Sequence, residues 1–132
     1  MDREEITKIC KEFDGKIGWM SIDGIADLCE NTNDIEKSKR VAKKMMDWNS
    51  TGLHLCNILH KTFDKERGTG HLGSFAEKKS ESIIFLRSTD QKDKNSPVEV
   101  RQKSSRGAPF DDFYFDLDTD ILIPKECEQP KW

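Results

Sequence analysis

Two stretches in the first half of the chain repeat hydrophobic residues at helical spacing. Residues 3–13 place four apolar side chains on one face, which predicts a short amphipathic helix. Those side chains are Ile6, Ile9, Cys10 and Phe13. A second helix is predicted from near Ile35, behind the capping candidates Asn33 and Asp34. Its apolar stripe consists of Val41, Met45 and Trp48.

Three short apolar runs predict strands. Residues 17–22 are followed directly by Asp23. Their continuous apolarity is typical of a parallel strand that is covered on both faces. Residues 53–59 form the second run and residues 82–87 the third. A polar, glycine-rich loop over residues 60–73 is predicted between the last two, followed by a short helix over residues 74–80.

Alternation of apolar and polar residues predicts two further strands, over residues 97–103 and 110–117. They are expected to pair in antiparallel fashion, and the tail over residues 125–132 is expected to fray. The whole order predicts an α/β fold of one domain, residues 1–132. It would have parallel strands with right-handed crossover helices and a C-terminal antiparallel β-hairpin that extends one edge of the sheet.

Composition narrows the picture. Hydrophobic residues make up 34% and charged residues 36% of the chain, so either the core is small or apolar surface is supplied from elsewhere. A net charge of -3 gives no global basic field, and any nucleic-acid binding would need a local patch. No apolar run approaches the length of a membrane span, which predicts a cytoplasmic protein that does not enter membranes. Four scattered cysteines without a C-x-x-C pair favour free thiols over a disulfide framework or a zinc site.

The residues that leave each predicted strand are the candidates for chemistry, since ligands of open α/β sheets bind at the carboxyl ends of strands. Asp23 follows the first strand, where an acid can hold Mg²⁺ through water; an Asp-Gly turn is the simpler alternative. His60 follows the second strand and would either sense a phosphate or bond locally.

Basic side chains gather in two places. The basic side chains of the loop after the second strand would either contact a DNA backbone or simply be solvated. They are Lys61, Lys65 and Arg67, with Gly70 and His71 beside them. Near the C-terminal turn, Lys103 and Arg106 would reach a phosphate of a neighbouring subunit or keep an edge strand soluble.

The succession of motifs resembles RecA-like P-loop ATPases of the RepA and DnaB replicative-helicase type, from the Walker B strand onward. Residues 19–28 (WMSIDGIADL) resemble the Walker B strand and the loop after it. Residues 51–60 (TGLHLCNILH) are similar to the next helix end and strand. Residues 67–74 (RGTGHLGS) resemble the group's RGHLG loop, and residues 103–113 resemble its terminal hairpin.

The resemblance implies roles. Asp23 would be the Walker B acid that holds Mg²⁺ beside ATP, and His60 would occupy the sensor position. Residues 62–73 would face single-stranded DNA in a central channel. Lys103 and Arg106 would act in trans on the γ-phosphate of the adjacent subunit of a ring, built from this chain or a full-length homologue. Their spacing is K-x-x-R where DnaB-like helicases usually show K-x-R, which leaves Arg101 as a further candidate.

Two parts of the family pattern are missing. The sequence contains no G-x-x-x-x-G-K-[ST] loop, and the catalytic glutamate has no counterpart, because Glu4, Glu5 and Glu12 lie in the first predicted helix. In the family, the P-loop strand lies between the strands at residues 53–59 and 82–86. Without it, either these two strands pair directly, or the chain is part of a longer protein and marginally stable alone.

The sequence therefore predicts the C-terminal part of a RecA/RepA-like ATPase that acts in DNA replication or mobilisation. This part is expected to be inactive alone because the Walker A loop is missing. A non-catalytic module that binds DNA or assembles with a full-length ATPase ring is the alternative. A plain α/β domain with solvated polar loops is the third.

Overall fold

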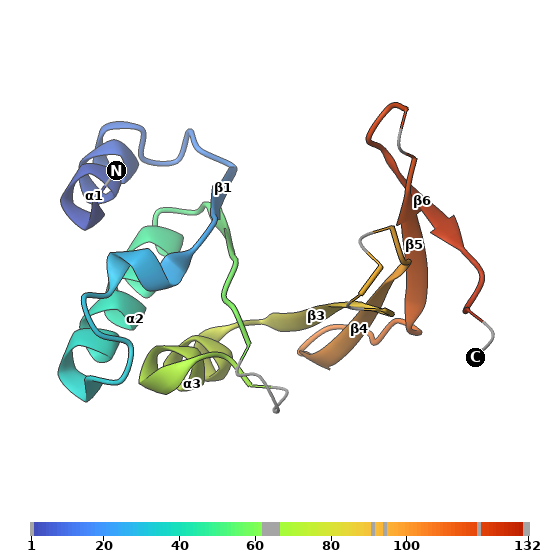
Figure 1. Cartoon of the computed structure of the whole chain (residues 1–132). Coiled ribbons are helices and arrows are strands. Elements are labelled where there is room, and N and C mark those ends of the chain that lie inside the picture. Colours follow the sequence, from blue (N-terminus) through green and yellow to red (C-terminus); the bar gives the residue numbers. More distant parts are fainter. Residues whose placement is uncertain (1, 62–66, 91, 94, 119, 131–132) are drawn as a thin grey trace. The chain divides into compact units, whose positions relative to one another are not determined.

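Helices and strands alternate in the first part of the chain, and the described elements of the second part are all strands, in the computed structural model (Figure 1). The structure describes residues 2–61, 67–90, 92–93, 95–118 and 120–130. Contacts divide the chain into two compact units, Met1–Lys79 and Ser80–Trp132, where the sequence predicts one domain. The fold class is α/β, as predicted, with a parallel two-stranded sheet in the first unit and an antiparallel four-stranded sheet in the second.

The first two helices form where the apolar spacing predicts them. Helix α1 spans Arg3–Glu12, and a capping box closes its first turn: Asp2 accepts from the Glu5 N–H, and Glu5 accepts from the Asp2 N–H. Helix α2 spans Ile35–Asn49. Of the two capping candidates, Asp34 is its N-cap and accepts from the Lys37 N–H at 2.9 Å.

One apolar core holds the first unit together. Trp48 is 1% exposed, and its indole N–H donates to the Thr7 hydroxyl at 3.0 Å, which satisfies the polar end of a buried ring. The other core members come from α1 and α2, from residues 25–29, from the residue before His54 and from the helix that begins at Gly70. They are Ile6, Cys10, Ile25, Cys29, Val41, Met45, Leu53, Leu72 and Ala76.

Strands β1 (Trp19–Ile22) and β2 (His54–Asn57) pair in parallel, with Trp19 opposite His54 and Ile22 opposite Asn57. The prediction that β1 is covered on both faces is wrong. Met20, Ile22 and Leu55 pack against the core, whereas Trp19 is 60% exposed and stacks on His54 with 4.7 Å between ring centroids. The helices of this unit share one core, so the sheet has one buried face.

Helix α3 spans Gly70–Lys79 and so begins within the segment predicted to be a loop up to residue 73. The cause is a set of contacts that a local pattern does not reveal. The N–H groups of His71 and Leu72 both donate to the Thr32 carbonyl, at 2.8 and 3.2 Å, which satisfies free N–H groups of the first helical turn. The helix then packs along α2, with Leu72 fully buried.

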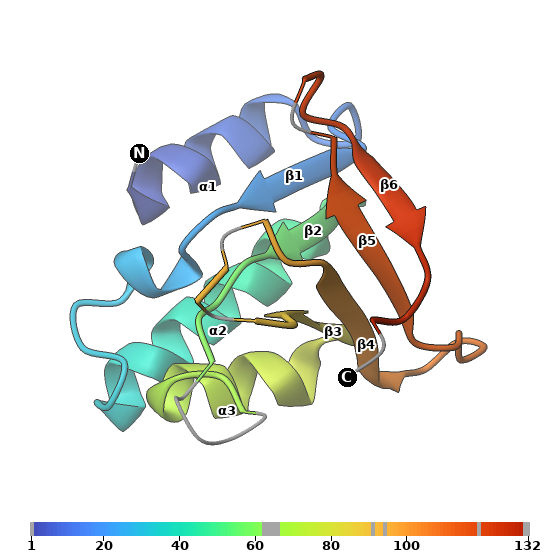
Figure 2. The same ribbon diagram turned by 45° about the vertical axis from the view of Figure 1, so that its right-hand side comes forward.

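Strands β3 (Ser82–Ser88), β4 (Val98–Ser105), β5 (Phe113–Leu117) and β6 (Pro124–Cys127) form the antiparallel sheet of the second unit in chain order. The predicted antiparallel pairing of β4 with β5 is confirmed. Figure 2 shows β4, β5 and β6 next to one another in this sheet.

Two expectations about β3 need correction. It does not join β1 and β2 in a parallel sheet, and it does not pair directly with β2. Within the part of the chain that the structure describes, β3 pairs only with β4. The physical reason is proximity, since a hairpin partner a few residues away closes a much smaller loop than a partner in another unit.

The start of the segment expected to fray is ordered. Residues Pro124–Cys127 form β6 and pair with β5, with Lys125 opposite Asp116 and Cys127 opposite Tyr114. The Lys125 ammonium also contacts the Asp118 carboxylate at 2.5 Å. Because β5 and Asp118 lie just before β6 in the chain, the strand is stabilised locally.

Candidate functional site

The parallel register of β1 and β2 brings their carboxyl ends to the same edge of the sheet. Ile22 lies opposite Asn57, and the ladder continues with the Ile58 N–H donating to the Ile22 carbonyl at 2.9 Å. Asp23, which directly follows β1, therefore lies at this edge. The chain from β2 to His60 continues toward the same edge. Both side chains are exposed, so either can meet a ligand from solvent.

A tight turn fixes the chain directly after Asp23. Gly24 adopts φ +77°, and a Cβ at that position would lie 2.8 Å from a carboxylate oxygen of Asp27. The Asp27 N–H donates to the Gly24 carbonyl, which opens a short 3-10 helix over Ile25–Leu28. Ile25 is fully buried and its N–H donates to the Ile58 carbonyl, so the turn after β1 is tied to the end of β2. The carboxylates of Asp23 and Asp27 thus flank one hydrogen-bonded turn.

Asn57 is a residue of this edge that sequence reasoning missed. Its side-chain oxygen is buried and has no hydrogen-bond partner among the described residues. A buried acceptor without a donor costs about 1–3 kcal/mol, so such a group usually meets a partner in the working protein. The available signal was a single amide inside the mostly apolar run of residues 53–59.

The loop after β2 closes on itself at its base. Lys61 and Gly68 form an isolated antiparallel bridge. The Thr69 hydroxyl and N–H both donate to the His60 carbonyl, at 2.7 and 3.2 Å. His60 and Lys61 are thereby held beside the turn that leads into α3. Lys65, a predicted DNA contact, lies outside the described residues.

The remaining predicted loop residues pack on α3 or form its first turn. Arg67 donates to the Ser74 hydroxyl at 2.5 Å, and its side chain remains exposed. Gly70 has φ +67°, and a Cβ there would lie 2.5 Å from the Thr32 carbonyl oxygen, so this glycine is required by close packing. His71 is exposed on the first turn of α3.

Lys103 and Arg106 belong to the second unit, whereas Asp23 and His60 belong to the first. The β3–β4 pairing shifts between Ile83 and Ile84, from Ser104 to Gln102, so Lys103 is the extra residue of a β-bulge. Its ammonium lies 5.4 Å from the centroid of the Phe85 ring. Arg106 follows β4 directly, its N–H donates to the Glu81 carbonyl at 3.0 Å, and its side chain is exposed.

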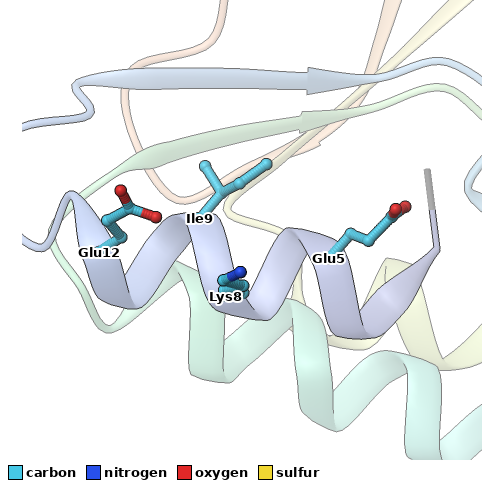
Figure 3. Close-up of a pocket in the computed structure, with 4 residues that line it drawn as sticks. All are labelled: Glu5, Lys8, Ile9 and Glu12. Carbon is cyan, nitrogen blue, oxygen red and sulfur yellow. The ribbon is translucent and has the colours of Figure 1, made fainter.

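The edge does not hold a complete metal site by itself. In the described part of the chain, no three His, Cys, Asp or Glu side chains come together in a way that could bind a metal ion. A hollow elsewhere, along α1, is lined by Glu5, Lys8, Ile9 and Glu12 (Figure 3). Its side chains project side by side from one helix and do not converge on a common point, so it offers no catalytic arrangement. None of the described helices combines the length and apolarity that a bilayer crossing requires.

Comparison with protein-family models gives no match to this sequence. Comparison with curated proteins also gives no match. The functional assignment therefore depends on the geometry of the β1–β2 edge and on the sequence motifs.

Proposed function

We propose that this chain supplies the Walker B side of a nucleotide site in a RecA-like, helicase-type ATPase of the RepA/DnaB kind. The observation that carries the proposal is the parallel pairing of β1 with β2, which aligns Asp23 and the chain leading to His60 at one sheet edge. An acid after one parallel strand and a polar residue after its neighbour is the arrangement that P-loop enzymes use beside their phosphates.

The small size of the β1–β2 sheet supports the proposal that a further segment completes it. Among the described residues, no third strand pairs with β1 or β2, although parallel sheets are normally larger and covered on both faces. Trp19 is 60% and Ile58 47% exposed on these strands and their continuation. A P-loop strand beside β2 would use its open hydrogen-bonding edge.

The bulge at Lys103 bears on the residues proposed to act in trans. A β-bulge adds one residue to a strand and changes the direction of nearby side chains. The two residues between Lys103 and Arg106 keep their register with β3, so the bulge does not account for the K-x-x-R spacing, where DnaB-like helicases usually show K-x-R. The proposal that Lys103 and Arg106 would contact the γ-phosphate of a neighbouring subunit is therefore supported by the sequence resemblance alone.

The residues at the edge fit Mg²⁺ and ATP as one half of a site. Mg²⁺ keeps several waters and takes one or two carboxylates together with substrate phosphates, and Asp23 is the carboxylate that would hold it. When bound, the ion neutralises phosphate charge. The backbone N–H groups and lysine of a phosphate loop have to come from a segment outside this sequence, so the chain alone is expected to hydrolyse no ATP.

Paramagnetic broadening by Mn²⁺, with and without ATP, tests this assignment in NMR spectra of the chain. We expect broadening of the amide signals of Asp23, Gly24 and His60, and its loss in Asp23→Asn. The control, Asp27→Asn, removes an equal charge from the same turn, and this variant is expected to retain the broadening. Broadening that persists in Asp23→Asn, or that appears only at the acidic Asp111 and Asp112, would contradict the proposal.

Calorimetry with Mg-ATP tests the statement that a phosphate loop is needed. We expect no detectable heat of binding from the chain alone, because a single carboxylate without N–H donors gives too little affinity. Tight binding that Asp23→Asn abolishes would show instead that the chain contains a complete nucleotide site of a different design.

Binding of single-stranded DNA is a second candidate function, favoured by one observation. The Lys61–Gly68 bridge gathers Lys61, Arg67 and His71 around the base of a single loop, which is a local basic patch on a nearly neutral chain. Fluorescence anisotropy with a labelled oligonucleotide is expected to show salt-dependent binding that Arg67→Glu weakens. The matched control is Lys16→Glu, an equal charge change at an exposed position before β1.

A further inference from the structure

The turn between β5 and β6 exposes three consecutive large aliphatic side chains. Ile121 is 58%, Leu122 75% and Ile123 54% exposed. Scattered exposed apolar residues are ordinary, but a contiguous exposed apolar group is a mark of an interaction site. We refer to Ile121, Leu122 and Ile123 as the apolar tip.

The apolar tip is held in a defined and strained conformation. Leu122 adopts φ +54°, a left-handed conformation that bulky side chains rarely take. The Asp118 carboxylate accepts from the N–H groups of Asp120 and Ile121, and the Asp118 carbonyl accepts from the Leu122 N–H at 2.7 Å. Strain of this kind persists where surrounding contacts impose it, and it is concentrated at functional positions.

The surroundings of the apolar tip are strongly acidic. Residues 108–130 carry seven acidic side chains against one lysine. That lysine, Lys125, is already paired with Asp118. Nucleic acids and anionic membrane surfaces are therefore disfavoured, since both would be repelled. The tip fits a protein surface that combines apolar and basic groups.

Such a surface exists on the same chain, on the outer face of α2. Ile35, Lys39, Lys43 and Met46 recur at helical spacing on one side of α2, and all four are exposed. We call these four residues the α2 outer stripe. The whole helix carries five basic and two acidic side chains, and Lys43 makes no ion pair with any residue that the structure describes. Lys39 is paired with Glu36, but α2 as a whole is net positive and so complements the acidic surroundings of the apolar tip, while Ile35 and Met46 supply apolar contacts.

We propose that the apolar tip of one copy of this chain docks on the α2 outer stripe of a second copy. The two surfaces differ, so the contact is head-to-tail and builds rings where the rotation closes. The contact uses neither Asp23 nor His60, and its failure would leave the proposed nucleotide site untouched.

Sedimentation velocity of the chain over a concentration series tests the contact. We expect reversible self-association that weakens at high salt, because charge complementarity contributes to it. Leu122→Asn is expected to reduce the association about tenfold or more, the order seen when an apolar anchor is removed. Asparagine tolerates the left-handed conformation, so this variant should fold at least as stably as the parent chain. The matched control, Ile84→Asn on β3, removes another exposed aliphatic side chain and is expected to associate normally.

A charge exchange identifies the partner surface. In the proposed contact, Asp120 beside the apolar tip faces Lys43 of the second copy. Asp120→Lys and Lys43→Glu are each expected to weaken association, and their combination is expected to restore it, because this ion pair is re-formed with reversed signs. A monomer at all concentrations would overturn the proposal. An equal loss in Ile84→Asn, or a double variant no better than the single ones, would also overturn it.

Discussion

Gly73 and Gly68 show how closely the turn before α3 packs on the helix. A Cβ at Gly73 would lie 2.2 Å from the carbonyl carbon of Gly68 and 2.3 Å from its oxygen. Both are backbone atoms, which cannot rotate away as a side chain can. The turn is also fixed by the Gly68 N–H, which donates to the Glu77 carboxylate at 2.9 Å.

Replacing Gly73 by alanine is therefore expected to destabilise the first unit by about 1–3 kcal/mol, the usual cost of forcing extra volume into a packed site. Urea denaturation followed by tryptophan fluorescence, to which buried Trp48 contributes, measures this effect. Gly18→Ala is the control, because a Cβ at Gly18 meets nothing within 4 Å. Equal stability of the two variants would show that the turn before α3 relaxes without cost.

Tyr114 lies in a row of polar side chains across three strands. Its hydroxyl donates to the Glu99 carboxylate at 3.2 Å, and Glu99 forms an ion pair with Arg87 at 2.8 Å. The register places Arg87 opposite Glu99 and Glu99 opposite Tyr114. Desolvation, together with the negative charge of Glu99, raises the pKa of Tyr114 above its usual value.

The chain contains one tyrosine, so an ultraviolet absorbance titration reports this group alone. We expect its midpoint to lie above about 10, the ordinary value for tyrosine. Glu99→Gln is expected to lower the midpoint, because the nearby negative charge no longer opposes ionisation, while the part due to desolvation remains. An unchanged midpoint in Glu99→Gln would show that Glu99 does not influence the ionisation.

At the scale of the element, α2 depends on its N-cap. The Asp34 carboxylate accepts from the Lys37 N–H, and this hydrogen bond, which favours the charged carboxylate, lowers the pKa of Asp34. Because the pKa of Asp34 is lower in the folded than in the unfolded chain, its ionised carboxylate stabilises the fold at pH values above the unfolded pKa of about 4. That contribution is lost as the pH falls from there through the folded pKa.

Asp34→Asn is expected to retain the cap at neutral pH and to lose this part of the acid sensitivity. Asp34→Ala is expected to lower the unfolding midpoint at neutral pH, because the Lys37 N–H loses its acceptor. Thermal unfolding followed by circular dichroism between neutral and acidic pH compares the three proteins. A parent chain and an Asp34→Asn variant with the same pH profile would contradict this role of Asp34.

For the whole molecule, the four cysteines report on the two units separately. Cys10 and Cys29 are buried in the first unit, and burial raises the pKa of the Cys10 thiol, which disfavours the reactive thiolate. Cys56 and Cys127 are half-buried. Cys127 lies on β6 of the second unit.

Pulse labelling with a thiol reagent and mass spectrometry is expected to modify Cys56 and Cys127 first. Cys10 and Cys29 should react together, and only as the first unit unfolds, because they share one core. In denaturant all four should react at similar rates, which serves as the control. Early, independent modification of Cys10 would contradict a cooperatively folded first unit.

Much of the secondary structure could be predicted because it depends on local patterns. The apolar stripe of α2 and the cap at Asp34 are both set within a few residues. The candidate site was predictable in part, since Asp23 and His60 follow apolar runs. Asn57 was not found, because the burial of its oxygen depends on atoms distant in sequence. The early start of α3 was missed because the Thr32 carbonyl that satisfies its first turn lies well over thirty residues earlier.

The sequence by itself determined the first two helices, the β-strands of alternating polarity and the residues that leave β1 and β2. These features follow from the spacing of side chains along a local backbone. Only the tertiary structure decided that β3 pairs with β4 in a separate antiparallel sheet and that one face of β1 stays exposed. The reason is that strand pairing and coverage are settled by competition among distant partners, which hydrophobic periodicity does not encode.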